Sequence, residues 1–361
     1  MGPALWILFA FNFLLAAGMM ATYVSRRGYM KDNAELPLDQ KYSPNVLVIM
    51  PVKGIDYELE KNLLSIKAQD YKKYDIIAVV DDMSDPSVEI LNGLSIRTIV
   101  SSEGCKNCSG KVRAIISALS MFDRYDCYVV ADSDIRVNRD WLYKLVMPLS
   151  LPTVGVVTTF PLFVPEAGFW SKVKMYWGLV GQSMMESRLT RFVWGGSMAF
   201  RKDLLDKEGL SLLSESISDD VAIMRISKKK GLTIVYAPEA KPEIHSTDNF
   251  LQFMEWSNRQ TALSVNSSIN VFIFGMLYFT VGIYLILSSI VLLTIGHAIF
   301  TVFLIPFLYN SVNSWRRLQF RVYYFLLISF ILPFVYLYNL MIGKSKKSIN
   351  WRGNRYRLTS P

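Results

Sequence analysis

Two aspartates with the spacing of a metal or phosphate site follow a short apolar run. The run 127–130 reads Cys-Tyr-Val-Val, which is typical of a buried strand, and Asp132 and Asp134 come just after it. Open α/β sheets bind nucleotides at the carboxyl ends of their strands. Carboxylates are also ligands that Mg²⁺ and Mn²⁺ prefer. The pair could therefore hold a divalent cation against a nucleotide diphosphate, or it could be two solvated acids in a turn.

Three further aspartates stand where predicted strands end or helices begin. Asp82 closes the apolar run 76–80 and could accept hydrogen bonds from a nucleobase or a ribose. Asp219 and Asp220 stand near the start of a predicted helix, where the helix dipole stabilises a carboxylate. Asp220 could then act as a general base toward a hydroxyl group, with Asp219 beside it. Each of these acids could instead only cap a helix or a turn.

Alternating strand and helix patterns are expected to position these acids. This order predicts an α/β fold with a mostly parallel, Rossmann-like sheet covered by helices on both faces. The carboxyl ends of parallel strands meet at one edge, so the acid clusters should gather there. Strands are predicted at 46–50, 76–80, 98–100, 127–130, 154–159, 197–200 and 232–236, and helices at 57–69, 111–122, 171–189 and 220–226.

A tryptophan and two glycines could receive a sugar. Gly195 and Gly196 follow Trp194 and could let backbone and an aromatic ring approach a sugar closely, although Gly-Gly is also a common turn. Gln252 and Trp256 are four residues apart and therefore share a helical face. From the residues alone, Trp256 is more typical of an anchor at a membrane interface.

The composition is too apolar for a soluble protein, because 52% of the 361 residues are hydrophobic. The stretch 4–24 is uncharged and long enough to cross a bilayer core. Arg26, Arg27 and Lys31 follow it, which is typical of a retained anchor whose carboxyl end lies in the cytoplasm. We therefore expect a multi-pass integral membrane protein. The stretch 271–312 suits two spans that turn near Gly296, and 322–342 suits another.

Five segments are expected along the chain. The basic residues Arg316, Arg317 and Arg321 precede the last span, and the tail beyond it is equally basic, so charge does not fix the topology. One C-terminal segment could be re-entrant or interfacial. The segments are an N-terminal anchor at 1–31, a cytoplasmic globular domain at 32–247, an interfacial helix at 248–268, transmembrane segments at 269–343 and a basic tail at 344–361.

The formal charge of +9 comes from basic residues that cluster beside the apolar stretches. Anionic lipid headgroups are therefore the expected partner, and we expect neither nucleic acid nor an obligate protein partner. Cys105 and Cys108 have C-x-x-C spacing, but no second pair completes a zinc site, and three cysteines cannot build a disulfide framework.

Taken together, these motifs resemble the membrane-bound glycosyltransferases of family 2 type, most closely the ceramide glucosyltransferase-like branch. The resemblance implies a GT-A fold, a UDP-sugar donor, a lipid acceptor, Mg²⁺ or Mn²⁺ as cofactor, and inversion at the anomeric carbon. The expected sugar is glucose. The matching segments, in chain order, are 51–56, 82–86, 132–137, 218–220 and the tail 351–358.

The resemblance also implies roles for individual residues. Asp82 would contact the nucleotide, Asp134 would bind the metal with Asp132 on the nucleotide, and Asp220 would be the base beside Asp219. Trp194, Gly195, Gly196, Gln252 and Trp256 are expected on the acceptor side. The donor-binding set is completed by Pro51, Lys53, Gly110 and Lys111.

One position departs from the family pattern. The family motif Q/R-x-x-R-W aligns with 252–256, but Glu255 stands where the family has arginine. Arg259 or an arginine of the tail would have to replace that cation at the diphosphate. Two other functions stay open, a processive polysaccharide synthase and a nucleotide-sugar-binding membrane protein without catalysis. The small number of predicted spans argues against a polymer channel.

Overall fold

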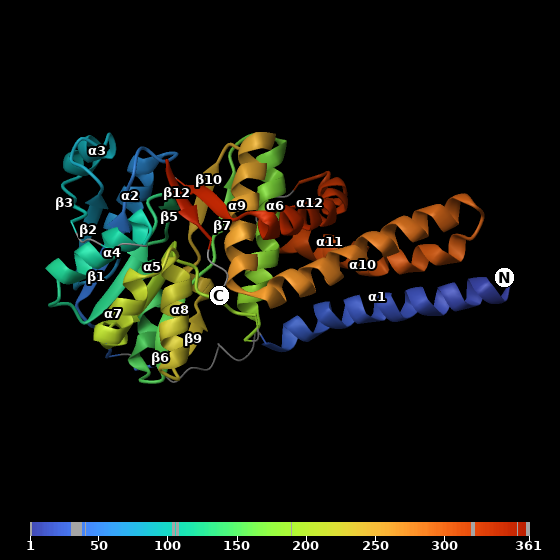
Figure 1. The fold of residues 1–361 in the computed structure, drawn as a ribbon, viewed down its shortest axis with the longest axis horizontal. Coiled ribbons are helices and arrows are strands. Elements are labelled where there is room, and N and C mark those ends of the chain that lie inside the picture. The colour runs from blue at the N-terminus through green and yellow to red at the C-terminus, as the bar shows by residue number, and fades with distance from the viewer. Residues whose placement is uncertain are drawn as a thin grey trace. The chain divides into compact units, whose positions relative to one another are not determined.

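The chain forms two compact units. A computed structural model describes residues 2–29, 38–39, 41–102, 105, 108–188, 190–318, 322–351 and 353–358, and Lys31, Arg321 and Arg352 lie outside them. The sheet unit comprises Met30–Val164 and Gly181–Ser246. The helical unit comprises Met1–Tyr29, Pro165–Val180 and Thr247–Pro361. Figure 1 shows the helices and strands of both.

The sheet unit is built on a central sheet whose strand order is β3-β2-β1-β4-β8-β6-β9. Neighbouring strands are parallel except at β8, which runs antiparallel to both β4 and β6. The predicted mostly parallel α/β sheet is therefore confirmed. The strands are β1 (Val46–Pro51), β2 (Tyr74–Val80), β3 (Arg97–Val100), β4 (Cys127–Ala131), β6 (Val154–Thr158), β8 (Ser197–Arg201) and β9 (Thr233–Tyr236).

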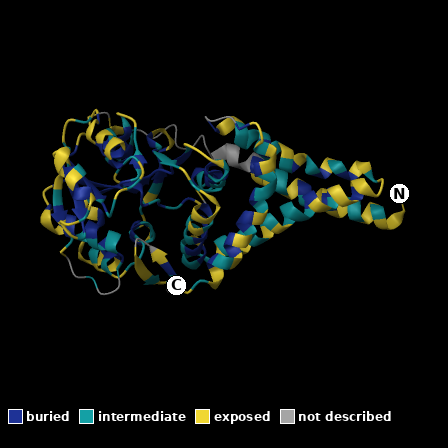
Figure 2. Cartoon of the chain, turned by 90° about the horizontal axis from the view of Figure 1, so that it is seen from above, coloured by how far each residue is buried: buried dark blue, intermediate teal, exposed yellow. Residues whose placement is uncertain are grey.

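Both faces of this sheet are covered, because successive side chains of a strand point to opposite sides. Val46 and Val48 of β1 lie in one core cluster, whereas Leu47 and Ile49 lie in the other. Buried residues line the strands in Figure 2. The first cluster is closed by α2 (Leu59–Lys67), α3 (Ser87–Gly93) and α5 (Trp141–Val146), and the second by α4 (Gly110–Met121), α7 (Lys207–Ser214) and α8 (Asp219–Lys229).

A small second sheet has the order β5-β10-β7. Its strands are β5 (Ile135–Arg136), β7 (Leu162–Pro165) and β10 (Glu243–Ser246). The strand patterns of the sequence did not predict it, because a strand of two to four residues shows no clear alternation. It matters for the site because β5 follows Asp134 immediately and pairs with β10.

Within the described residues, four helical segments of the helical unit are apolar and long enough to cross a membrane by length and composition: Pro3–Tyr23, Ile269–Thr294, Ala298–Arg317 and Phe325–Ser345. The predicted turn near Gly296 is confirmed, since its φ of 89° suits glycine. The elements of this unit are α1 (Pro3–Tyr29), the first part of α6 (Phe169–Glu186), α9 (Phe250–Ser267), α10 (Ile269–Thr294), η5 (Ala298–Leu304), α11 (Ile305–Arg317), α12 (Phe325–Ser345), β11 (Ser348–Trp351) and β12 (Asn354–Arg357).

The apolar helix α12 packs against α9 and α6 through a buried polar contact. The amide group of Asn339 donates to Asn258 Oδ1 at 2.9 Å and to Ser257 Oγ at 3.2 Å. Its Oδ1 accepts from Trp177 Nε1 at 3.2 Å. A buried amide must be hydrogen-bonded to avoid a desolvation cost, so these partners fix one face of α12 toward protein.

Helix α9 begins with a capping box. Asn249 Oδ1 accepts from the Gln252 N–H at 3.0 Å, and Gln252 Oε1 accepts from the Asn249 N–H at 2.9 Å. Asn249→Ala should destabilise this helix start by about 1 kcal/mol. Amide hydrogen exchange in the first turn of α9 should then be about fivefold faster. Asn249→Asp keeps the acceptor and should exchange as the native chain does; equal exchange in the alanine variant would contradict the capping role.

Candidate active site

Asp132 and Asp134, called the D-x-D pair below, lie at the carboxyl end of β4, as their position after an apolar run predicts. All five residues of β4 are buried, and the chain turns at Ser133 and Asp134. Because β8 pairs antiparallel with β4, it brings its own amino end to this edge, with Ala131 opposite Ser197. The Asp132 N–H donates to the Gly196 carbonyl at 3.0 Å. The predicted acids and the predicted glycine pair therefore meet at one corner of the sheet.

Lys111 joins three separate segments at this corner. Its Nζ lies 2.7 Å from Asp132 Oδ1 and 3.2 Å from Asp219 Oδ2, and it donates to the Gly195 carbonyl at 3.0 Å. Lys111 is the second residue of α4, so the start of that helix delivers the ammonium group to the strand ends. The acids after β4 and at the start of α8 are thus held around one cation.

Burial governs the charges of this group. The side chains of Lys111 and Asp219 are only 9% and 7% exposed, whereas Asp132 is 31% exposed. Burial alone would lower the pKa of Lys111, but the carboxylates of Asp132 and Asp219 hold it above its usual range, so the ammonium stays charged. Burial raises the pKa of Asp219 to about 6; Lys111 opposes this rise, and Asp220 and Asp132 add to it.

Asp220 lies in the first turn of α8 beside this buried group. Its Oδ1 accepts from the Ser218 hydroxyl and, at 2.7 Å, from the Val221 N–H. The side chain is partly exposed, unlike its neighbour Asp219. The fixed orientation and the access to solvent are both properties that a general base needs.

Gly195 and Gly196 are required by close packing at this corner. A Cβ atom on Gly195 would lie 2.5 Å from Asp219 Oδ2, and one on Gly196 would lie 2.1 Å from the ring of Trp194. The Trp194 N–H donates to Thr158 Oγ1 at 2.9 Å, which ties this segment to the end of β6. The glycines let the buried carboxylate of Asp219 approach the backbone.

We expect Gly195→Ala to lower kcat about 10-fold, because the added methyl group must displace Asp219 and with it the start of α8. The measurement is steady-state turnover of the sugar transfer that the motif resemblance implies, at saturating donor. Gly93→Ala is the matched control, since no atom lies within 4 Å of a Cβ at that position. Native turnover by the Gly195 variant would show that this contact is not needed.

The loop after β1 contacts the segment that carries the D-x-D pair through a hydrogen bond and an ion pair. Ser133 Oγ donates to Asp56 Oδ2 at 2.5 Å, and Arg136 forms an ion pair with Glu58 at 2.7 Å. Glu58 has a φ of 49°, a strained conformation for a residue other than glycine. The Arg136 guanidinium, together with Lys61, lowers the pKa of Glu58 to about 2. The sequence patterns did not predict Glu58 and Arg136 as supports, although Arg136 lies within the matching segment 132–137 and Glu58 follows the segment 51–56.

Asp82 lies at the same edge, two strand positions away from Asp132. Neighbouring strands are spaced by roughly 4.8 Å, so the strands β2 and β4 that precede the two acids lie about 10 Å apart. Asp82 is exposed, and its Oδ1 accepts from the Ser84 N–H at 2.7 Å, which lowers the pKa of its carboxyl group. The structure thus places Asp82 on the same edge of the sheet, but not in the cluster that Lys111 forms with Asp132, Asp219 and Gly195.

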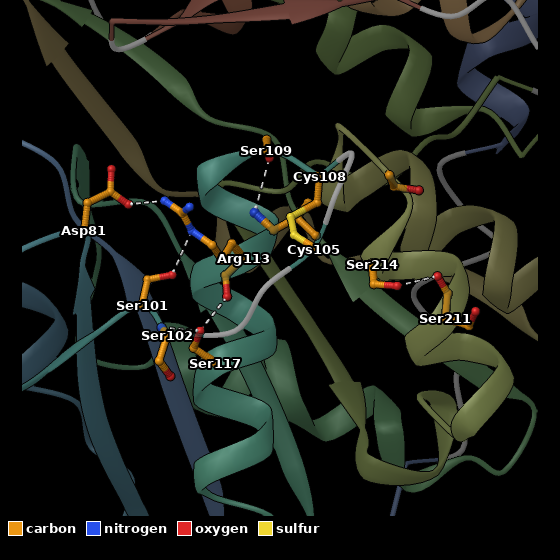
Figure 3. The surroundings of a disulfide bond; sticks show 12 residues. Asp81, Ser101, Ser102, Cys105, Cys108, Ser109, Arg113, Ser117, Ser211 and Ser214 are labelled. Carbon is orange, nitrogen blue, oxygen red and sulfur yellow. Dashed lines mark hydrogen bonds and ion pairs between the residues drawn. A yellow bond between two sulfur atoms is a disulfide. The ribbon is translucent and has the colours of Figure 1, made fainter.

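Asp81, which the sequence did not single out, is the ion-pair partner of Lys53. Its carboxylate lies 2.9 Å from Lys53 Nζ. It also lies 3.0 Å from the Arg113 guanidinium of α4, as Figure 3 shows. Pro51 ends β1, one strand closer to β4. The predicted donor-binding residues therefore line the strand ends between Asp82 and Asp132.

Gly110 is the first residue of α4, and Ser109 caps that helix by accepting from the Val112 N–H at 3.2 Å. Just before the cap, Cys105 and Cys108 form one local disulfide (Figure 3). It spans three residues and is not a framework of several bridges.

The predicted acceptor residues Gln252 and Trp256 belong to the helical unit. Gln252 takes part in the capping box of α9. Trp256 packs edge-on against Trp177 at 4.9 Å and lies under Lys174 Nζ at 4.7 Å from the ring centroid. Glu255 is exposed. Their roles toward an acceptor stay predictions.

The donor chemistry of the corner fits a hard divalent cation. Asp132 and Asp219 offer carboxylate oxygens around the buried Lys111, and Asp134 and Asp220 stand two positions and one position further along the chain. Oxygen donors with net negative charge suit Mg²⁺ or Mn²⁺ better than a soft metal. Asp134, which is partly exposed after the turn, is the residue that the motif assigns to the ion.

The family model for glycosyl transferase family 21 matches residues 7–361. The chain therefore belongs to this family, which is that of the ceramide glucosyltransferases, and the resemblance seen in the motifs is confirmed. It is a glycosyltransferase with a GT-A fold.

A solved structure supports the fold, and a second similar one is more distant. A mannosyltransferase from Pyrobaculum calidifontis, solved with GDP-Man and Mn²⁺, matches with a TM-score of 0.55 at 15% identity over 92% of this chain and 97% of that chain. Glucosyl-3-phosphoglycerate synthase from Mycobacterium tuberculosis, solved with Mn²⁺ and UDP-glucose, matches with a TM-score of 0.41 at 14% identity over 64% of this chain and 87% of that chain.

Proposed function

We propose that residues 32–247 form the catalytic domain of an inverting glycosyltransferase that moves a sugar, expected to be glucose, from a UDP-sugar to a lipid. The observation that carries this proposal is the meeting of Asp132, Asp219 and Gly195 around Lys111, with Asp220 beside them. The membership of family 21 supports the reaction class.

On the donor side, Asp82 would accept hydrogen bonds from the nucleotide, and Pro51 and Lys53 would line the same strand ends. Asp134 would hold Mg²⁺ or Mn²⁺, which supplies charge stabilisation to the departing diphosphate when bound. Mn²⁺ accompanies the nucleotide sugar in the mannosyltransferase that shares the fold. Asp132 would serve the nucleotide from its place beside Lys111.

On the acceptor side, Asp220 would take the proton of the attacking hydroxyl group. Its carboxylate is fixed by Ser218 and by the Val221 N–H, so little reorganisation is needed when the hydroxyl arrives. Attack by a hydroxyl activated in this way, opposite the leaving diphosphate, would invert the anomeric carbon. Trp194 with its two glycines, and Gln252 with Trp256, are the proposed contacts of the acceptor.

A lipid acceptor fits the composition of the chain. Four helical segments within the described residues are apolar and long enough to cross a membrane. We propose an integral membrane protein with the catalytic domain in the cytoplasm, where basic residues would meet anionic lipid headgroups. The orientation is tested by adding protease to sealed vesicles. If the sheet unit is digested only by protease on the lumenal side, the cytoplasmic orientation is excluded.

The decisive assay uses the full chain in detergent with UDP-glucose, Mn²⁺ and a membrane lipid extract. Release of UDP together with one discrete glycolipid, identified by mass spectrometry, supports the proposal. A polymeric product would favour a processive synthase. Binding of UDP without turnover would favour a non-catalytic nucleotide-sugar-binding protein. Replacing UDP-glucose by other sugar nucleotides identifies the sugar.

A further inference from the structure

We propose that Lys111 is a positioning residue, which fixes Asp132 and the Asp219 end of α8 relative to each other, and is not a ligand of the donor diphosphate. The proposal rests on the proposed function, because it assigns Asp220 of the same helix to catalysis. It differs from the donor-binding role that the sequence motif predicts for Lys111.

The first argument is the number of donors. A lysine ammonium group has three N–H donors and no acceptor. Three oxygens surround Nζ at 2.7, 3.0 and 3.2 Å, and they belong to Asp132, Gly195 and Asp219. The Gly195 carbonyl accepts a hydrogen bond from Nζ, and the carboxylates of Asp132 and Asp219 lie within ion-pair distance of it. Protein oxygens therefore surround the ammonium group, and a diphosphate would have to displace one of them.

The second argument is burial. Lys111 is 9% exposed, whereas Lys53, at the same edge, is 39% exposed. The buried ammonium group lies between two carboxylates, and it cannot move toward a ligand without leaving the buried carboxylate of Asp219 without its partner. Lys53, by contrast, is close enough to solvent to meet a phosphate.

The third argument is where the contacts lead. Asp219 is the first residue of α8, and Asp220 follows it in the same turn. Gly195, whose carbonyl accepts from Lys111, is followed by Gly196, whose carbonyl accepts from the Asp132 N–H. Lys111 therefore connects the start of the helix that carries the proposed base with the turn that carries the D-x-D pair.

The test is a double-mutant cycle with Lys111→Met, Asp219→Asn and the double variant in the full-length protein. Methionine keeps much of the aliphatic stem and removes the charge. Each single change should lower kcat about 30-fold, because Asp220 loses its orientation. The double variant should fall by about the same factor and not by the product. The dissociation constant of UDP should change less than threefold in all three variants, because the hydrogen bond from the Asp132 N–H to the Gly196 carbonyl still holds Asp132 in place.

Lys144→Met is the matched control, since Lys144 forms an ion pair with Asp140 at 2.7 Å outside the cluster; its kcat should stay within twofold of native. Three results would overturn the proposal: native turnover by Lys111→Met, multiplicative effects in the double variant, or a UDP dissociation constant raised tenfold or more with kcat preserved. The last result would restore the donor-binding role.

Failure of the proposed function gives a different result. In that case the wild-type protein transfers no sugar from any nucleotide donor to the lipid extract. The thermal unfolding midpoints of the same four proteins then test the contact by themselves. Non-additive midpoints support the Lys111–Asp219 link, and additive midpoints overturn it.

Discussion

Asp220→Asn is expected to lower kcat about 10³-fold while leaving the dissociation constant of UDP nearly unchanged. General base catalysis is worth about 10²- to 10⁴-fold in rate. Asparagine keeps the shape of the side chain and can still accept from Ser218 and the Val221 N–H, so the helix start should survive. The measurement is steady-state transfer at saturating donor and acceptor, with UDP binding by calorimetry.

Asp206→Asn is the matched control for that variant. Asp206 also stands at the start of a helix, where its Oδ1 accepts from the Gly209 N–H at 2.9 Å. Asparagine caps helices about as well as aspartate, so this control should keep native turnover. If Asp220→Asn turned over at the native rate, Asp220 would not be the base, and Asp219 would be the next residue to replace.

Asp134→Asn should have a comparably large effect, about 10³-fold in kcat/KM at low Mn²⁺. A bound cation stabilises developing charge by several kcal/mol, and each 1.4 kcal/mol is about tenfold in rate. The amide of asparagine is a much weaker metal ligand than a carboxylate, so the Mn²⁺ concentration for half-maximal activity should rise. The experiment is a Mn²⁺ titration of transfer, alongside Mn²⁺-dependent binding of UDP.

The control for this change is Asp140→Asn, a half-exposed aspartate soon after the D-x-D pair that forms an ion pair with Lys144. Its Mn²⁺ dependence should match that of the native protein. An unchanged Mn²⁺ titration in Asp134→Asn would mean that the cation, where needed, is held by other residues.

The large sheet could be predicted because its strands are apolar runs of four to seven residues between clear turn signals. The small sheet could not, since Ile135–Arg136 forms a two-residue strand whose partner β10 lies about a hundred positions later. The turn at Gly296 was predictable because Gly-His interrupts a long apolar stretch.

The candidate site was predictable only in its residue types. Acids after strands identified Asp82, Asp132 and Asp134, but their distances depend on strand order, which no local pattern encodes. The contact of Lys111 with Gly195 requires β8 to run antiparallel beside β4. Likewise, the ion pair of Glu58 with Arg136 joins residues 78 positions apart, and Glu58 has a positive φ that a glutamate gives no reason to expect.

The tight fit of Gly195 against Asp219 also bears on how this family can vary. A methyl group at 195 and a carboxylate at 219 cannot occupy the same space. Sequences that acquire a side chain at the first position should therefore have exchanged the second for a smaller residue, and each change alone should be disfavoured until the other has occurred. Positions 195 and 219 are 24 residues apart in the chain, and this steric exclusion predicts that they covary among related sequences.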